Sequence, residues 1–162
     1  SEPGVIAFYS ASDIPGVNSY IAAPNIFALQ NEELFCSGEV KYYDQPIGVI
    51  VAECESIAHK AASLVKVEYT NVRKPVIDIK EAKKDPDKYA VFATLPAVQT
   101  GPNTTKVIIG EDTVYSQYPF TMETFACVSY PTEEGIRMVA TTQWLDMVQQ
   151  ATSRALKMEE NR

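Results

Sequence analysis

The stretch GEVKYYDQPIGVIVAECESIAHKAASLVKVEYTNV, residues 38–72, carries the clearest architectural pattern in the sequence. Residues 40–43 are a short β-branched and aromatic run and residues 47–53 a continuous apolar run, which predicts two strands joined by the turn DQP. A helix is predicted over residues 55–65 and a third strand over residues 65–70. The stretch therefore predicts a strand–helix–strand unit whose helix packs on one side of a sheet.

The helical part of this stretch is amphipathic, with polar residues such as Glu55, His59 and Lys60 on one face. His59 is the only histidine of the chain. On an outward face, without further ligands nearby, it indicates a solvated surface residue in preference to a metal or catalytic site. The apolar face consists of Ile57, Ala58, Ala61, Ala62 and Val65.

The N-terminal residues predict shorter elements. Residues 5–9 are β-branched and aromatic, as in a strand. The sequence SASDIPG that follows predicts one helical turn, capped by Ser12 or Asp13 and ended by the Pro-Gly pair. Residues 18–35 contain the turn signals AAPN and QNEE and predict a loop.

A segment rich in Pro, Gly and Thr, TLPAVQTGPNTT, predicts a domain boundary or a long loop. Before it, residues 76–90 predict a brief strand and a Lys-rich helical turn, and after it, residues 106–120 predict one or two strands. Residues 123–131 alternate as a half-buried strand, TEEG turns the chain, and residues 136–143 predict the next strand of a β-meander. An amphipathic helix over residues 145–156 follows.

Composition and charge narrow the class of protein. A chain of 162 residues with 46% hydrophobic residues is long enough for a compact core, and we expect it to bury about two-thirds of its unfolded surface. The net charge of −7 disfavours nucleic acid and anionic membranes as partners. No apolar run approaches the ~20 residues of a membrane helix, which predicts a soluble protein.

The cysteines and glycines argue against several kinds of site. Cys36, Cys54 and Cys127 are scattered without a CxxC pair, which predicts reduced thiols in a reducing, cytoplasmic compartment and no zinc or iron–sulfur site. The seven glycines are spread singly and form neither GxGxxG nor GK[ST]. A nucleotide-binding loop is therefore not indicated.

The stretch ATTQWLDMVQQATSRAL, from residue 140, predicts a strand that turns into a helix and contains the only tryptophan. At this corner Gln143 offers a neutral amide beside a helix N-terminus, which favours anions or metal-bound oxygens. The alternative is that Thr142 or Gln143 caps the helix while Trp144 packs at the corner, and the residues alone favour this alternative. Glu123, among apolar residues in TMETFACV, either faces a site or serves as a capping or salt-bridging residue.

Three blocks, in order along almost the whole chain, resemble the molybdenum hydroxylases, the family of xanthine dehydrogenases and aldehyde oxidases. GVIAFYSASDIPG is similar to the family run G-V-x-A-x-x-[ST]-A-x-D-[IV]-P-G. The third block is SQYPFTMETFACVSYPTEEGIRMVATTQWLDMVQQATSRALKMEENR. The second block resembles V-x-Y-x-G-Q-P-x-[AG]-x-V-V-A with a following helix and strand, at Val40, Tyr42, Gln45, Pro46, Gly48, Val51, Ala52, Ala58, Ala61, Ala62, Val65, Val67 and Tyr69.

This resemblance implies an α+β fold with two domains. Residues 1–85 are expected to form an α/β hammerhead domain, and residues 86–105 a linker. Residues 106–162 are expected to form the first strands and helix of the molybdenum-cofactor-binding domain.

The resemblance also implies a role for the strand-to-helix corner. Gln143 is expected to reach the molybdenum centre, with molybdopterin as the cofactor, and to hydrogen-bond an oxygen ligand without ligating the metal itself. A fixed amide dipole orders such a ligand without the desolvation penalty of a buried charge. The residues expected to support the site are Thr142, Trp144, Glu123 and Gln117.

Departures from the family pattern point to a substrate class. Xanthine dehydrogenases have a pattern close to G-G-Q-E-H-F-Y-L-E-T at the place where this chain has YSQYPFTMET. Pro119 of this chain stands in place of the histidine of that pattern. The sequence of this chain resembles insect-type aldehyde oxidases more closely here, so we expect aldehydes as substrates in preference to purines. Cys54 replaces the threonine that usually caps the hammerhead helix, which predicts a weaker cap.

The resemblance implies a fragment of a larger enzyme, with no catalytic residue inside it. The family's iron–sulfur and flavin domains precede the part matched here, and a Gly-rich loop and the catalytic glutamate follow it. The implied full-length enzyme is a cytoplasmic homodimer that hydroxylates aldehydes or N-heteroaromatics with water-derived oxygen. It passes electrons through iron–sulfur clusters and FAD to O2 or NAD.

Two other hypotheses stay open at this point. One is a non-catalytic, truncated hammerhead interaction module. The other is an unrelated small α+β binding domain, which requires a closed core and no exposed apolar patch near Gln143 and Trp144.

Overall fold

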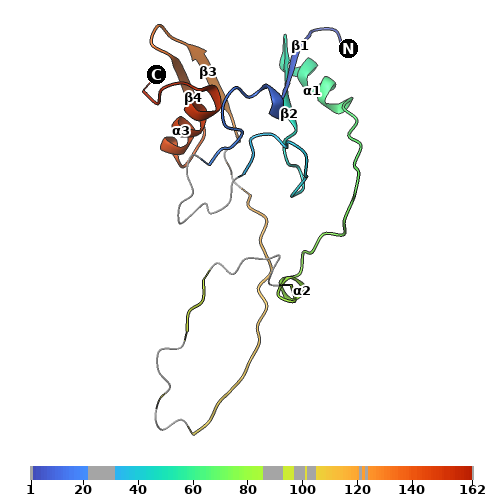
Figure 1. Ribbon diagram of the computed structural model, residues 1–162, viewed down its shortest axis with the longest axis vertical. Coiled ribbons are helices and arrows are strands. Elements are labelled where there is room, and N and C mark those ends of the chain that lie inside the picture. Colours follow the sequence, from blue (N-terminus) through green and yellow to red (C-terminus); the bar gives the residue numbers. More distant parts are fainter. Residues whose placement is uncertain are drawn as a thin grey trace. The chain divides into compact units, whose positions relative to one another are not determined.

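The computed structural model describes residues 2–21, 32–85, 93–96, 101, 105–120, 122 and 124–161. By their contacts these residues form two units, residues 1–66 with 120–162, and residues 67–119. The mixture of antiparallel strand pairs and helices confirms the predicted α+β class. In chain order (Figure 1) the elements are β1 (Val5–Ser10), η1 (Ala11–Asp13), β2 (Gly48–Ala52), α1 (Glu55–Ser63), α2 (Ile79–Ala82), β3 (Cys127–Pro131), β4 (Ile136–Ala140) and α3 (Leu145–Leu156).

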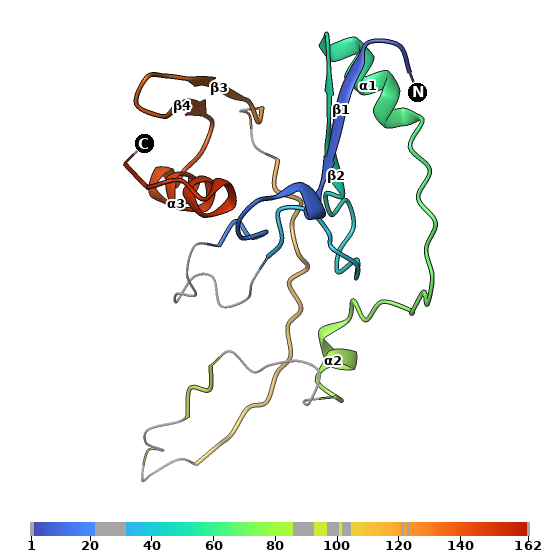
Figure 2. The same ribbon diagram turned by 45° about the horizontal axis from the view of Figure 1, so that its top comes forward.

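The first sheet consists of β1 and β2, which pair antiparallel where the sequence predicts two strands. Phe8 pairs with Ile50, and the register shifts between Val5 and Ala7, as in a β-bulge. The helix α1 lies along this strand pair (Figure 2). The helix therefore covers one side of a small sheet, as the pattern of residues 38–72 predicts.

Two residues, Cys54 and Gly4, determine how α1 begins and how closely it approaches β1. Cys54 occupies the N-cap position without a side-chain capping bond, which confirms the expected weak cap. Gly4 has a φ of 82°, and an added Cβ would lie 2.6 Å from Ile57 Cδ1. The close approach of the helix to the strand therefore needs a glycine at this position.

The helical turn η1 is present, but its cap differs from the prediction. Ser10 is the N-cap, not Ser12 or Asp13. The Asp13 carboxylate reaches back and accepts a hydrogen bond from the Ser10 main-chain N–H at 2.8 Å and from the Ser10 hydroxyl at 2.9 Å. This reciprocal capping box fixes the start of the turn one residue before Ala11.

The second sheet consists of β3 and β4, which pair antiparallel with Val128 opposite Val139. The connecting turn is closed by the Thr132 N–H, which donates to the Gly135 carbonyl at 2.8 Å. Both strands and the turn fall within the predicted β-meander. The helix α3 begins at Leu145 and ends at Leu156, as predicted.

Several predicted strands are not formed in the described residues, among them the brief strand predicted at the start of residues 76–90. Residues 40–43, 65–70 and 106–120, all within the described part of the chain, have no strand structure. Their side chains are largely exposed, as for Val67 and Tyr69. A strand is stable only beside a partner strand that accepts and donates its main-chain hydrogen bonds, and these segments have β-forming residues without such a partner.

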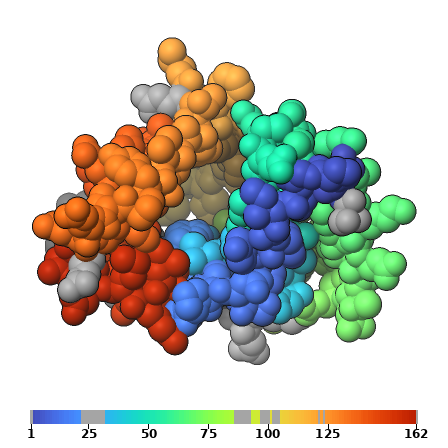
Figure 3. All heavy atoms as spheres, turned by 90° about the horizontal axis from the view of Figure 1, so that it is seen from above, coloured from blue at the N-terminus to red at the C-terminus, as the bar shows by residue number. Residues whose placement is uncertain are grey.

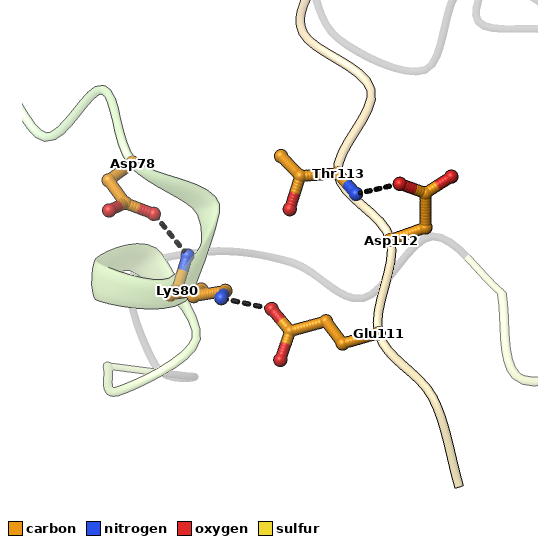
Figure 4. A network of polar contacts seen from close by, with 5 residues as sticks. All are labelled: Asp78, Lys80, Glu111, Asp112 and Thr113. Atoms are coloured by element: carbon orange, nitrogen blue, oxygen red, sulfur yellow. Dashed lines mark hydrogen bonds and ion pairs between the residues drawn. The ribbon is translucent and has the colours of Figure 1, made fainter.

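The unit of residues 67–119 contains the predicted Lys-rich helical turn, now α2. The Asp78 carboxylate caps this turn by accepting the Lys80 main-chain N–H at 2.7 Å. The Lys80 ammonium forms an ion pair with Glu111 (Figure 4). Because both side chains of the pair are mostly exposed, it contributes little to stability.

The described residues do not form the expected compact core. The chain exposes 15024 Å², whereas a compact folded monomer of 17.9 kDa exposes about 8,000 Å². Within the described residues, the buried side chains are Ser19, Ile21, Gln45, Ala151, Ser153 and Ala155. The expectation of two-thirds burial is therefore wrong, because strand pairs of two bury too little apolar surface.

Among the described residues, no helix has both the length and the apolar character required to cross a bilayer. The longest, α3, has 12 residues. A bilayer core requires about 20.

Candidate functional site

The corner between β4 and α3 is held on the strand side by Thr141. Its main-chain N–H donates to the Ala126 carbonyl at 3.0 Å, which extends the ladder past the last residue of β4. Its hydroxyl accepts the Ala126 N–H, also at 3.0 Å, in place of the main-chain carbonyl. Thr141 therefore ends the strand pair with both hydrogen bonds of Ala126 satisfied.

On the helix side the corner is held by Thr142. Its hydroxyl accepts the main-chain N–H of Trp144 at 3.0 Å. Trp144 is the N-cap of α3, and its carbonyl accepts the Val148 N–H at 3.3 Å. Thr142 is therefore not a side-chain cap of α3, which has none, but its hydroxyl satisfies the N–H of the N-cap residue itself.

Gln143 follows these two fixed threonines directly and is exposed. Within the described part of the chain, its side-chain amide makes no hydrogen bond, so it does not cap α3. The side chain does not lie in an apolar interior. An amide held at a bend and directed to solvent is free to bind a group from outside these residues.

Next to this corner lies an apolar groove with a volume of about 540 Å³. Trp144 contributes a half-exposed indole to it. An exposed apolar groove at Trp144, together with the small buried core, contradicts the hypothesis of an unrelated small domain with a closed core. The groove is lined by Tyr20, Leu34, Thr142, Trp144, Met147, Val148, Ala151, Thr152, Ala155 and Leu156.

The other predicted site residues lie outside the described part of the unit that contains this corner. Gln117 lies in an exposed, extended stretch of the unit of residues 67–119. Glu123 lies outside the described residues. Their supporting roles stay predictions.

Direct metal ligation by this chain has no basis in the described residues, which contain no group of three or more His, Cys, Asp or Glu side chains suited to a metal. His59 is exposed on α1, 3.4 Å from Glu55, which confirms it as a surface residue. The Ser56 hydroxyl, 3.2 Å from the Cys54 sulfur, lowers the pKa of that exposed thiol.

Sequence reasoning missed Thr141, Tyr20 and Leu34 at this site. The doubled threonine in ATTQW was a usable signal for Thr141, because threonine hydroxyls bind nearby main-chain groups at turns. Tyr20 and Leu34 come from the predicted loop of residues 18–35, over a hundred positions away along the chain. No local pattern places them beside α3.

Residues 1–73 match the family model described as "Aldehyde oxidase and xanthine dehydrogenase, a/b hammerhead domain". Indole-3-acetaldehyde oxidase of Zea mays is 30% identical to this chain, over 94% of the chain and 12% of that protein. Aldehyde oxidase 4 of Cavia porcellus is 30% identical over 99% of the chain and 12% of its own length. Xanthine dehydrogenase/oxidase of Gallus gallus is 28% identical over 100% of the chain and 12% of its own length.

These relatives match through the strand-to-helix corner as well as the N-terminal part, because the alignments cover nearly all of the chain. The chain spans about 12% of the length of each of these curated relatives. The chain belongs to the family of aldehyde oxidases and xanthine dehydrogenases, and residues 1–73 carry its a/b hammerhead domain.

Proposed function

We propose that this chain is part of a molybdenum hydroxylase in which Gln143 hydrogen-bonds an oxygen atom in the ligand shell of a molybdopterin cofactor. The observation that carries the proposal is the exposed amide of Gln143, which has no partner among the described residues and stands between Thr142 and Trp144, two residues joined by a hydrogen bond. A side chain fixed at its base and unpaired at its tip is suited to orient an external group.

The residues present suit a role beside the cofactor in which the chain does not bind the metal directly. A neutral amide both donates and accepts hydrogen bonds, so it can order an oxygen ligand without adding charge. The N-terminus of α3 lies one residue further on, and its unpaired N–H groups favour a partly negative oxygen. Thr142 and Trp144 support Gln143 by holding the first turn of the helix.

The cofactor supplies the redox chemistry that inserts a water-derived oxygen into a carbon–hydrogen bond. The remainder of the parent enzyme supplies the catalytic base, the iron–sulfur clusters and FAD, with O2 or NAD as the acceptor. We place this enzyme in the cytoplasm as a homodimer. The 12% span of this chain on its relatives supports the view that most of these parts lie outside residues 1–162.

For the substrate we propose an aldehyde in preference to a purine or another N-heteroaromatic. The support is Pro119, which stands where the xanthine dehydrogenase pattern has a histidine. Loss of that polar side chain removes a hydrogen-bonding group that a heteroaromatic ring could use, whereas an aldehyde needs fewer polar contacts. Aldehyde oxidases and a xanthine dehydrogenase match this chain at nearly equal identity.

The test is Gln143→Ala in the full-length protein, with Gln149→Ala as the matched control. Gln149 lies on α3 and donates to the Glu160 carbonyl, so its replacement removes an amide from the same helix but not from the corner. We expect Gln143→Ala to lower kcat with an aldehyde about 100-fold, as for other fixed hydrogen-bond donors at a reacting oxygen. Molybdenum content should stay unchanged. Equal kcat values for wild type and Gln143→Ala would refute the assignment.

The alternative is a non-catalytic hammerhead interaction module. The observation that favours it is the number of exposed large apolar residues on the first sheet, including Ile6, Phe8 and Val49. Sequencing the transcript on both sides of the coding region separates the two: an in-frame continuation supports the enzyme, and a stop codon after residue 162 supports the module.

A further inference from the structure

The last turn of α3 leaves two main-chain carbonyls without a donor from its own helix. Lys157 adopts the left-handed conformation, with φ 56° and ψ 42°, and its N–H donates to the Ser153 carbonyl. The Met158 N–H also donates to Ser153, at 2.9 Å. This helix ending satisfies Ser153 but not the two carbonyls that follow it, at Arg154 and Ala155.

The missing donors come from the other end of the chain. The Gly16 N–H donates to the Ala155 carbonyl at 2.8 Å, and the Val17 N–H donates to the Arg154 carbonyl at 3.1 Å. Figure 3 shows the blue N-terminal segment packed against the red C-terminal helix. We call residues 16 and 17 the clamp. The clamp satisfies these two carbonyls at the end of α3 with donors that lie more than 130 positions earlier in the chain.

Only glycine fits at the first position of the clamp. A Cβ added at Gly16 would overlap the Arg154 carbonyl oxygen and lie 2.8 Å from the Ala155 carbonyl oxygen. Both neighbours are main-chain atoms, so no side chain can move aside to make room. A larger residue must therefore displace the segment from the helix end.

The chain after the clamp continues along the same helix. The Asn18 amide donates to the Phe35 carbonyl at 2.7 Å and accepts the Phe35 N–H at 3.0 Å, which closes the loop that leads back to Leu34. Tyr20 and Leu34 line the groove, which runs along α3 from Trp144 to Leu156. This segment and α3 supply all but one of the buried side chains among the described residues.

From this geometry we infer that Gly16 is a positioning residue for Gln143: the clamp fixes the direction of α3 and thereby the corner at its N-terminus. A helix of 12 residues is about 18 Å long. Once the C-terminal end is released, a rotation of the helix by roughly 10° about its middle moves the corner end by about 1.5 Å. A misplacement of about 1 Å can lower turnover about 100-fold, so this lever arm is long enough to matter.

The inference rests on the proposed function for its kinetic part only. Docking of the clamp on α3 is tested separately, by hydrogen exchange of the full-length protein with mass spectrometry. We expect Gly16→Ala to raise exchange at least tenfold in peptides that cover residues 16–21 and 145–158. The matched control is Gly38→Ala, because a Cβ at Gly38 meets no atom within 4 Å. Exchange equal to that of Gly38→Ala would overturn the inference.

Steady-state kinetics of the variants test whether Gly16 acts through Gln143. We expect Gly16→Ala to lower kcat about tenfold with little change in KM, and the double variant with Gln143→Ala to be no slower than Gln143→Ala alone. Multiplied losses in the double variant would overturn the positioning role. If Gln143→Ala leaves kcat unchanged, the proposed function fails while the exchange result still decides the docking.

A milder variant covers the case in which Gly16→Ala does not fold. Asn18→Ala removes the two bonds to Phe35 that hold the chain next to the clamp, and so weakens the docking of the clamp without a steric clash. We expect it to raise exchange in the same peptides by a smaller factor. No increase in either peptide would contradict the inference.

Discussion

The hydroxyl of Thr142 accepts the main-chain N–H of Trp144 at 3.0 Å, and this contact connects the end of the second sheet to the first turn of α3. It fixes the direction in which the chain leaves the strand pair. Gln143 lies inside this two-residue loop, so its Cα cannot move without breaking the bond. The local geometry of the corner therefore depends on the hydroxyl of Thr142.

Replacing Thr142 by Val keeps the shape of the side chain and removes the hydroxyl. The Trp144 N–H then loses its acceptor, and because the corner is exposed, water replaces it in part. We expect a loss of about 0.5–1 kcal/mol in the free energy of unfolding, measured by urea denaturation. Thr142→Ser keeps the hydroxyl and should behave as wild type. A Val variant as stable as the Ser variant would contradict the role of this bond.

Gly4→Ala tests the close approach of α1 to β1. The residue has a φ of 82°, a conformation that costs a residue with a Cβ about 1–2 kcal/mol, and the new methyl group would also collide with Ile57. We expect a lower thermal midpoint for Gly4→Ala in a melting experiment. Gly38→Ala, where the added methyl group meets open space, should melt with the wild type. Equal midpoints for the two variants would show that β1 and α1 do not pack as described.

The Asp13 carboxylate gives the first helical turn a pH dependence. Hydrogen bonds from the Ser10 main-chain N–H, and then from its hydroxyl, lower the pKa of Asp13 below its ordinary value. A lowered folded-state pKa means that the stabilisation is present above the ordinary value, about 3.9, and is lost as the pH falls through the folded pKa. Titration of the Asp13 carboxyl by NMR should give a midpoint below that of an unstructured Asp peptide.

Ser10→Ala is the matched control for this titration. It removes the hydroxyl bond and leaves the main-chain bond, which is the larger cause of the shift. The midpoint should therefore rise only part of the way towards the ordinary value. A wild-type midpoint at or above the ordinary value would refute the capping box.

Limited proteolysis should separate the two units. The chain around Arg73, Lys74 and Lys106 is exposed and lacks helix or strand structure. Arg154 lies inside α3, next to the carbonyls bound by the clamp. Trypsin should cut the isolated chain first after Arg73 and Lys106 and later after Arg154, because cleavage needs a locally unfolded backbone, while the bond between Lys74 and Pro75 resists trypsin. Early cleavage at Arg154 would show that the helix is not held.

The same isolated chain should bind an apolar dye. Its accessible surface is almost twice that of a compact protein of its mass, and large apolar side chains contribute to it on both sheets. Fluorescence of such a dye should rise strongly on addition of the chain. Unchanged fluorescence of the dye would favour a closed domain, which the structure does not show.

Local patterns in the sequence decided the elements that need only their own neighbours. The helix α3 follows from apolar spacing alone, and β3 and β4 follow from alternation around a TEEG turn. The strands β1 and β2 carry enough β-branched residues to be recognised apart from each other. In each case the information lies within about 12 residues, which is the reach of helix and hairpin geometry.

The residue patterns failed where a partner strand had to be present. Residues 65–70 and 106–120 have the composition of strands but remain unpaired in the described chain, since composition cannot supply a neighbour's hydrogen bonds. The cap of η1 was misassigned for a smaller reason. Ser12, Asp13 and Ser10 can all cap a turn, and only the three-dimensional reach of the Asp13 carboxylate selects Ser10.

The sequence by itself determined the family of this protein, the α+β class and the corner that presents Gln143. Only the tertiary structure decided that Gly16 and Val17 complete the hydrogen bonds of α3, and that Tyr20 and Leu34 line the groove beside Trp144. The physical reason is range. Helix and turn preferences act between residues close in the chain, whereas the satisfaction of a helix end and the lining of a groove depend on segments that only folding brings together.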